Sequence, residues 1–223
     1  MTNIIYEKMG VNANIINPDF NTVILDLNGT ITRSISSDPR HISYRNNYIK
    51  NKIKKPVGRN LPKTTSEALL LFGLDPDEYY RHRNKNIDWN SFNSYSEATI
   101  NQLNELKFLG YNLVLYTDCF LSQVKPTLSI IKATHYFNLI VSKESGYKKP
   151  NAGAYEFIAK KLGVKINKLL MIANSWQQDL YPLQSIGGNT IWIKSEKYLN
   201  EAVSIIAKTH LKKLHKKNYT ISY

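Results

Sequence analysis

One short stretch near the N-terminus decides the fold: Thr22-Val23-Ile24-Leu25-Asp26-Leu27-Asn28-Gly29-Thr30. An apolar run rich in β-branched residues ends at a carboxylate, which is followed by a turn-forming Asn-Gly pair and a hydroxyl. This pattern is typical of a buried parallel strand that delivers one aspartate to the carboxyl edge of a sheet, where α/β proteins place their functional groups. The stretch therefore predicts an α/β fold with Asp26 in its functional site.

From about residue 96 onward, the chain alternates between strand-like and helix-like segments. Apolar runs predict strands over residues 112–116, 139–141, 169–173 and 190–193. Helical spacing and helix-ending glycines predict helices over residues 98–109, 121–134 and 152–162, a short helix before Gly187, and a last helix over 197–213. Alternation of this kind predicts a Rossmann-like parallel sheet with helices on both faces, and we expect residues 1–30 and 96–223 to form this core.

Residues 31–95 do not follow that alternation. They include a turn-rich piece at residues 55–62 and helical stretches, one of which begins where Asp75 caps the helix and Pro76 takes the first helical position. We therefore expect residues 31–95 to form a mainly helical unit inserted into the core.

The 223-residue chain carries a net charge of +13. One interpretation is attraction to nucleic acid, nucleotides or a membrane surface, and the other is the codon bias of an AT-rich genome, since lysine outnumbers arginine 24 to 6. Codon bias alone does not explain why all six arginines lie between Arg33 and Arg83. Arginine is the side chain best suited to bidentate phosphate contacts. The C-terminal tail holds a second basic cluster, formed by Lys208, Lys212, Lys213, Lys216 and Lys217.

Other features of the sequence argue against membrane and secreted classes. No apolar segment reaches the 18 or more residues of a membrane span, and the N-terminus lacks the basic start and apolar stretch of a secretory signal. The single cysteine, Cys119, has no partner for an internal disulfide. We therefore expect a cytoplasmic protein with no membrane partner.

Chemically useful side chains flank four of the predicted elements. Asp26 follows the first strand, Thr117 the second, Lys149 precedes the helix over 152–162, and Asn174 and Asp179 follow the strand over 169–173. A doubly wound sheet brings such positions into one crevice. A carboxylate can accept a phosphoryl group, a hydroxyl and an ammonium can hold its oxygens, and Mg²⁺ prefers oxygen ligands. The set predicts phosphoryl transfer.

In order and spacing, these residues resemble the four motifs of the haloacid dehalogenase superfamily. The first motif, Asp-x-Asp-Gly-Thr, matches residues 26–30 with Asn28 at its third position, and the second matches Thr117. The third matches Lys149-Pro150, and the fourth, Gly-Asp-Ser-x-x-Asn-Asp, aligns with residues 173–179. The resemblance spans about Thr22 to Ile193. It places residues 31–95 where the family carries a helical cap that closes over the substrate.

The resemblance implies a Mg²⁺-dependent phosphatase or phosphotransferase that acts on a phosphate monoester through an aspartyl phosphate. The implied catalytic residues are Asp26, Asn28, Thr117 and Lys149. The implied substrate-binding residues are Thr117, Asp118, Lys149 and, from the cap, Arg59. The implied metal ligands are Asp26, Asn28, Asn174 and Asp179. The expected partner is a small phosphorylated substrate; the cap arginines suggest a nucleotide, and the basic cap and tail suggest nucleic acid.

Two departures from the family's motifs leave two functions open. Asn28 stands where family phosphatases have the aspartate that protonates the leaving group, and an amide does not titrate near neutral pH. Asn174 replaces a metal-ligating aspartate. The chain is then either a slow enzyme or a catalytically degenerate member that binds a phosphorylated ligand, nucleic acid or a protein. Lysines of the predicted cap also leave the family's phosphonate-cleaving chemistry open.

Overall fold

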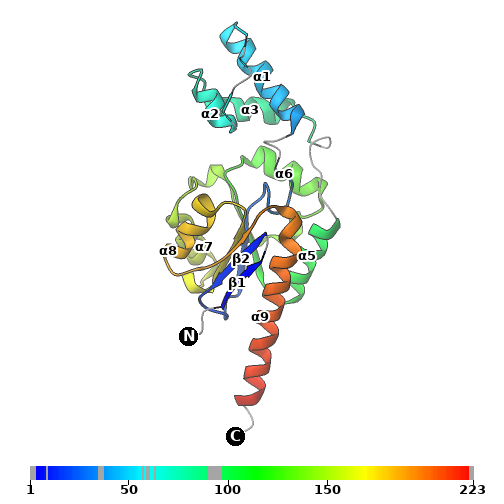
Figure 1. Ribbon diagram of the computed structural model, residues 1–223, viewed down its shortest axis with the longest axis vertical. Helices are drawn as coiled ribbons and strands as arrows, with labels where there is room; N and C mark the ends of the chain where they lie inside the picture. Colours follow the sequence, from blue (N-terminus) through cyan, green and yellow to red (C-terminus); the bar gives the residue numbers. More distant parts are fainter. Residues whose placement is uncertain are drawn as a thin grey trace. The chain divides into compact units, whose positions relative to one another are not determined.

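The computed structural model describes residues 4–8, 10–34, 38–56, 58, 61–62, 64–89 and 97–220 (Figure 1). The chain divides into two compact units. Met1–Arg33 and Ser94–Tyr223 form the core unit, and Ser34–Asn93 form the inserted unit. Among the described residues, no helix combines the length and the apolar character that a membrane crossing requires.

The core unit is built on one seven-stranded sheet with the strand order β1-β2-β7-β6-β3-β4-β5. Its strands are β1 (Ile4–Lys8), β2 (Val11–Ile15), β3 (Thr22–Leu25), β4 (Asn112–Tyr116), β5 (Leu139–Val141), β6 (Leu169–Ala173) and β7 (Asn189–Ile193). The five strands from β7 to β5 are parallel, with β3 between β6 and β4. The predicted α/β class is therefore confirmed.

The N-terminal hairpin corrects one part of the fold prediction, because it makes the sheet mixed instead of wholly parallel. β1 pairs antiparallel with β2, and β2 pairs antiparallel with β7. The alternation in Val11–Ile15 explains this pairing, since Val11, Ala13 and Ile15 are buried while Asn12 and Asn14 are not. Gly10 makes the turn with a φ of 88°, a backbone conformation that glycine adopts without strain.

Helices cover both faces of the sheet, as predicted. They are α5 (Glu97–Phe108), α6 (Leu121–Ile130), α7 (Ala152–Leu162), α8 (Tyr181–Ser185) and α9 (Leu199–Thr220). Figure 1 shows α5 and α9 side by side on one flank of the sheet, with α7 and α8 on the other. α7 has the predicted bounds, α6 ends four residues before the predicted Thr134, and α9 extends beyond the predicted Lys213.

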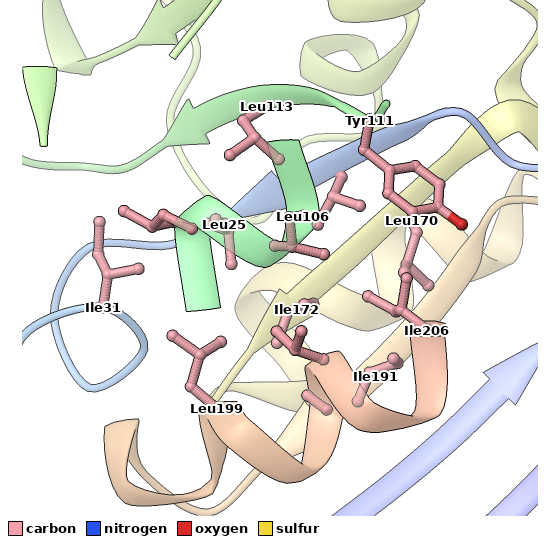
Figure 2. Close-up of a cluster of buried hydrophobic side chains, with 14 of the residues drawn as sticks. Leu25, Ile31, Leu106, Tyr111, Leu113, Leu170, Ile172, Ile191, Leu199 and Ile206 are labelled. Carbon is pink, nitrogen blue, oxygen red and sulfur yellow. The ribbon is translucent and has the colours of Figure 1, made fainter. Parts of the chain in front are cut away.

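The side chains of the central strands alternate between two hydrophobic clusters. Leu25, Leu113 and Ile172 point into the cluster shared with α5 and α9, which Figure 2 shows in close-up. Ile24, Val114 and Met171 point into the cluster shared with α7 and α8. Burial on both faces is why these strands read as continuous apolar runs in the sequence, and it fixes the register that aligns their carboxyl ends.

The inserted unit consists of helices with their own small core. These are α1 (Pro39–Ile53), α2 (Thr65–Leu70) and α3 (Pro76–Asn86). Asp75 caps α3 through the backbone N–H of Asp77, and Pro76 stands in its first turn, as predicted. The core of this unit packs around five buried side chains: Tyr48, Ile49, Ala68, Leu69 and Tyr79. The unit begins three residues later and ends two residues earlier than the predicted 31–95, and its role as a cap stays a prediction.

A buried histidine makes the stability of the inserted unit depend on pH. The pKa of His41 is lowered from 6.5 to about 4, mainly by burial and also by the neighbouring Arg83 and Arg45 charges, against an opposing effect of Asp38. His41 Nε2 lies 3.2 Å from Thr65 Oγ1. Because the folded pKa is depressed, unfolded chains bind more protons between pH 6.5 and 4, and stability is lost as the pH falls through this window.

We expect α1–α3 to lose up to about 3 kcal/mol between pH 6.5 and 4, from about 1.4 kcal/mol per pKa unit. Hydrogen exchange of peptides from these helices at several pH values measures this loss. His41→Gln should remove the dependence, whereas His82→Gln at an exposed position of α3 should retain it. An unchanged pH profile in His41→Gln would show that another group is responsible.

Candidate active site

The register of the parallel strands sets three site residues side by side. Leu25 of β3 pairs with Leu115 of β4 and with Ile172 of β6, so the chain leaves these strands at the same edge of the sheet. Asp26 follows β3 directly, and its backbone N–H donates to the Ile172 carbonyl at 3.4 Å. Thr117 stands two positions after Leu115, and Asn174 two positions after Ile172. Backbone pairing alone therefore delivers these residues to one edge.

Lys149 joins two carboxylates at this edge. Its Nζ lies 2.6 Å from Asp26 Oδ1 and 2.5 Å from Asp179 Oδ1. All three side chains are buried, with exposures of 8%, 7% and 2% for Lys149, Asp26 and Asp179. The sequence placed these residues 123 and 30 positions apart, and the fold brings them into direct contact. Their formal charges of +1, −1 and −1 leave the cluster with one net negative charge.

Burial and mutual charge shift the proton affinities within this cluster. Burial alone lowers the pKa of Lys149, but the Asp26 and Asp179 carboxylates outweigh it, and the net shift is upward. The pKa of Asp179 is raised to about 7, mainly by burial; Lys149 opposes this increase, and the Asp26 charge adds to it. The lysine is therefore a permanent cation, and one of the two carboxylates is held near its titration range at neutral pH.

Residues after β4 support the cluster. Thr117 is buried, and its Oγ1 accepts from the Cys119 N–H at 3.3 Å. Asp118 is exposed, and its Oδ1 accepts from the Lys149 backbone N–H at 3.0 Å. Asp118, predicted to bind substrate, thus holds the backbone of the lysine in place.

The two amides of the site lie in the loops after β3 and β6. Asn28 Nδ2 donates to Cys119 Sγ at 3.1 Å, which ties the first loop to the residues after β4. The backbone carbonyl of Asn174 accepts a hydrogen bond from Trp192 Nε1 at 3.0 Å. The Asn174 side chain lies close to Gly29: a Cβ added to this glycine would stand 2.4 Å from Asn174 Nδ2. Asn28 and Asn174 therefore lie at the same edge as Asp26, where Gly29 leaves room for the Asn174 side chain.

This close approach predicts that Gly29→Ala destabilises the core unit more than a positive φ alone explains. Gly29 and Gly110 both have a φ of 83°, but a Cβ at Gly110 would meet nothing within 4 Å. Gly110→Ala should cost about 1–2 kcal/mol from the left-handed backbone alone. Gly29→Ala should cost at least about 1 kcal/mol more because Asn174 must move. Urea unfolding measures both, and equal losses would show that the contact is not tight.

Two tyrosines that the sequence analysis did not single out lie against the cluster. Lys149 Nζ stands 5.0 Å from the centre of the Tyr116 ring, within range of a cation–π contact. Tyr155 of α7 donates its hydroxyl to the Asp179 carbonyl at 2.5 Å and packs edge-on against Tyr116 with ring centres 5.4 Å apart. A tyrosine at the end of a predicted buried strand was the only sequence signal for this aromatic floor.

Oxygen donors suitable for a hard cation are present at the same edge. Asp26 and Asp179 offer carboxylates, Asn174 a side-chain carbonyl, and residue 28 a backbone carbonyl, and this donor set fits Mg²⁺. Within the described ranges, however, no three His, Cys, Asp or Glu side chains are grouped so as to hold a metal ion. A metal site here would therefore need the neutral oxygens of Asn174 and of the residue 28 backbone in addition to the two carboxylates.

The arginines of the inserted unit are not all available to a substrate. Arg83 is 2% exposed, donates to Asn84 Oδ1, and lies over the rings of Tyr80 and Trp89. Arg45 is also buried and donates to the Pro62 carbonyl at 3.4 Å. These two arginines have a structural role, which weakens the argument for a nucleotide substrate. Arg59, predicted to bind substrate, lies outside the described residues.

Comparisons with curated proteins give partial matches to phosphatases. The chain is 27% identical over 99 residues to a glyceraldehyde 3-phosphate phosphatase of Methanothermobacter thermautotrophicus, which covers 44% of each chain. It is 28% identical over 92 residues to that of Pyrococcus abyssi, covering 40% of this chain and 38% of the relative. The matches thus span less than half the length of these relatives.

Solved structures share the fold at low sequence identity. A phosphatase from Thermococcus onnurineus matches with a TM-score of 0.57 and 19% identity, covering 77% of this chain and 85% of its own. A predicted phosphoglycolate phosphatase from Haemophilus somnus matches with a TM-score of 0.60 and 20% identity, covering 78% and 85%. The family model for haloacid dehalogenase-like hydrolases matches residues 18–193, which is most of the chain. The chain therefore belongs to the haloacid dehalogenase-like hydrolase family.

Proposed function

We propose that this protein is a Mg²⁺-dependent phosphatase or phosphotransferase that acts on a phosphate monoester through an aspartyl phosphate on Asp26. The observation that carries the proposal is the buried Asp26–Lys149–Asp179 cluster at the carboxyl edge of the sheet. A carboxylate beside a permanent cation suits attack on phosphorus, because the cation offsets the negative charge of the incoming phosphoryl group.

The proposed reaction has two steps. A carboxylate oxygen of Asp26 attacks phosphorus, the bond from phosphorus to the ester oxygen breaks, and the leaving alkoxide takes a proton from water. Water, or an acceptor alcohol in a transferase, then attacks the phosphorus of the aspartyl phosphate and releases Asp26. Lys149 and the Thr117 hydroxyl would hold the phosphoryl oxygens. Asn28 supplies no proton in either step, which predicts slow turnover of alkyl esters.

Asp26, Asp179, Asn174 and the carbonyl of residue 28 would hold Mg²⁺. When bound, the cation would neutralise charge on the phosphoryl oxygens. This set has one formal negative charge fewer than a set in which position 174 is aspartate. We therefore expect weaker Mg²⁺ binding than in family members with that aspartate.

The substrate class we propose is a small phosphorylated compound. The curated relatives are named for hydrolysis of glyceraldehyde 3-phosphate, which supports small phosphate monoesters. We further propose that the inserted unit acts as a cap and that Arg59 contacts the substrate, as the family resemblance implies. The single cysteine supports a cytoplasmic location.

The proposal is tested by trapping the phosphoryl group on Asp26. Turnover of p-nitrophenyl phosphate is measured with Mg²⁺ and with EDTA, and protein quenched during turnover is reduced with borohydride and examined by peptide mass spectrometry. We expect Mg²⁺-dependent turnover and reduction of Asp26 to homoserine. Turnover without modification of Asp26 would contradict the covalent mechanism. No turnover of any phosphate ester, with no Mg²⁺ binding by calorimetry, would contradict the enzyme.

The two amides favour a second function, a catalytically degenerate member of the family that binds a phosphorylated ligand, nucleic acid or a protein. Compared with the family's motifs, Asn28 and Asn174 replace two carboxylates at one edge of the sheet by neutral amides, while the Lys149 cation is kept. Such a site could bind an anion without turning it over. Inorganic phosphate binding without turnover of any ester would favour this function over the enzyme.

A further inference from the structure

The inserted unit carries a groove that the proposed phosphatase chemistry does not use. It lies between α1 and α3 and encloses about 390 Å³, within the size range of ligand pockets. Its lining residues are Tyr44, Asn47, Tyr48, Asn51, Lys52 and His82. The five from α1 follow the spacing i, i+3, i+4, i+7 and i+8, which places them along one face of the helix.

Aromatic rings form one part of the groove and hold each other in place. The His82 ring centre lies 6.1 Å from that of Tyr44 and 5.2 Å from that of Tyr48. The Tyr44 hydroxyl and His82 Nδ1 are 2.9 Å apart, and Tyr48 donates to Glu78 Oε1 at 3.3 Å. His82 is exposed and Tyr44 half-buried, so their rings are open to a flat ligand. Fixed aromatic faces are the surfaces on which nucleobases stack.

Two exposed amides stand one helical turn apart beside these rings. Within the part of the chain that the structure describes, neither the Asn47 nor the Asn51 side chain has a hydrogen-bond partner. An amide offers both a donor and an acceptor, which matches the mixed donors and acceptors of base edges. An acidic peptide would instead require cations at these positions.

Cations flank the groove instead of filling it. Lys52 is neutralised by Glu78, with Nζ 2.6 Å from Oε1. Lys50, Lys54 and Lys55 are exposed at the carboxyl end of α1, and no described carboxylate is paired with them. α1 itself contains no acidic residue. A ligand with a base in the groove and phosphates continuing past the end of α1 would use both features.

We propose that this groove binds single-stranded nucleic acid. One base stacks on the Tyr44 ring beside the His82 ring, which is tilted by 44° to it. The amides of Asn47 and Asn51 contact base edges, and the phosphates of the continuing strand meet the lysines at the end of α1. The strand is favoured over a free nucleotide because Lys54 and Lys55 follow Lys52, the last residue of α1 that lines the groove, and can meet the phosphates of neighbouring nucleotides. The groove uses no residue of the Asp26–Lys149–Asp179 cluster.

The test is fluorescence anisotropy of the full-length protein with labelled 12-residue dT and rU oligomers. Parallel titrations use a duplex of the same length, and AMP serves as a competitor. We expect tighter binding of a single strand than of the duplex, weak competition by AMP, and unchanged affinity in Asp26→Asn. Equal affinity for the duplex, or no binding, would overturn the proposal. If AMP displaces the oligomer at concentrations similar to those at which the oligomer itself binds, the ligand would be a mononucleotide, and the proposal of a single strand would be overturned.

Variants separate stacking from charge. Tyr44→Leu keeps apolar volume but removes the ring, and we expect a loss of affinity of about 5-fold or more. Asn47→Glu/Asn51→Glu changes only exposed side chains, so it should leave the fold intact and abolish binding. Lys54→Glu/Lys55→Glu should weaken the dependence of affinity on salt. The slope of log affinity against log salt concentration should fall in magnitude by about 0.7 for each phosphate contact that is lost. Lys160→Glu/Lys165→Glu on the core unit changes the net charge equally and should bind normally. Equal losses of affinity in the two double lysine variants would show that net charge alone drives binding, and would overturn the proposed site.

Discussion

Replacing Asp26 by asparagine should lower turnover of phosphate monoesters by about 10⁴-fold or more while the core unit stays folded. Asparagine has nearly the same shape but no nucleophilic carboxylate, so the first step of the proposed reaction is lost. The substitution also removes one of two negative charges around Lys149, which leaves a neutral pair with Asp179. We therefore expect no loss of stability, and the loss of activity can be assigned to chemistry.

The matched variant Lys149→Met should behave differently. It leaves the Asp26 and Asp179 carboxylates buried together with no cation between them. Removing one partner of a buried ion pair typically costs about 3–5 kcal/mol. Lys149→Met should therefore lose both activity and stability, as followed by turnover of p-nitrophenyl phosphate and by urea unfolding. Asp26→Ala guards against deamidation of the asparagine, and residual activity in Asp26→Ala would show that another group attacks phosphorus.

Much of the core could be predicted because its strands are buried on both faces. β3, β4 and β6 read as short apolar runs that end at polar residues, and this signal needs no information on distant contacts. The N-terminal hairpin gives a weaker sequence signal, because its strands are half polar and lie outside the βα alternation. In β2, the period-two pattern of Val11, Ala13 and Ile15 was the available signal.

The candidate site could be predicted only as a set of positions. Strand order and register explain why Asp26, Thr117 and Asn174 meet at one edge, and the family resemblance implied the roles of Lys149 and Asp179. Contacts between side chains could not be predicted from the sequence. For example, the hydrogen bond from Asn28 to Cys119 joins residues 91 positions apart. Burial of Arg45 and Arg83 could not be predicted either, because the sequence shows their charge but not the Pro62 carbonyl that Arg45 reaches or the rings over which Arg83 lies.

Asn28→Asp should raise the turnover of alkyl phosphates by about 10²–10⁴-fold, the range that a positioned general acid contributes. The side chain at position 28 lies at the catalytic edge, since Asn28 Nδ2 reaches Cys119, two residues after Thr117. A carboxyl group there could protonate an alkoxide and then accept a proton from the attacking water. Nearby negative charge from Asp26 should raise the pKa of the new carboxyl group and favour its acidic form.

The dependence on the leaving group distinguishes this explanation from a general improvement of the site. p-Nitrophenolate departs without a proton, so its ester should gain little, whereas glycerol phosphate should gain the full factor. Asn28→Ser cannot titrate and should gain nothing, and Cys119→Ala controls for the lost contact between Asn28 and the thiol. Equal gains for both esters would point to better Mg²⁺ binding by the added carboxylate. No gain for alkyl esters in a variant that still hydrolyses p-nitrophenyl phosphate would mean that proton transfer does not limit this enzyme.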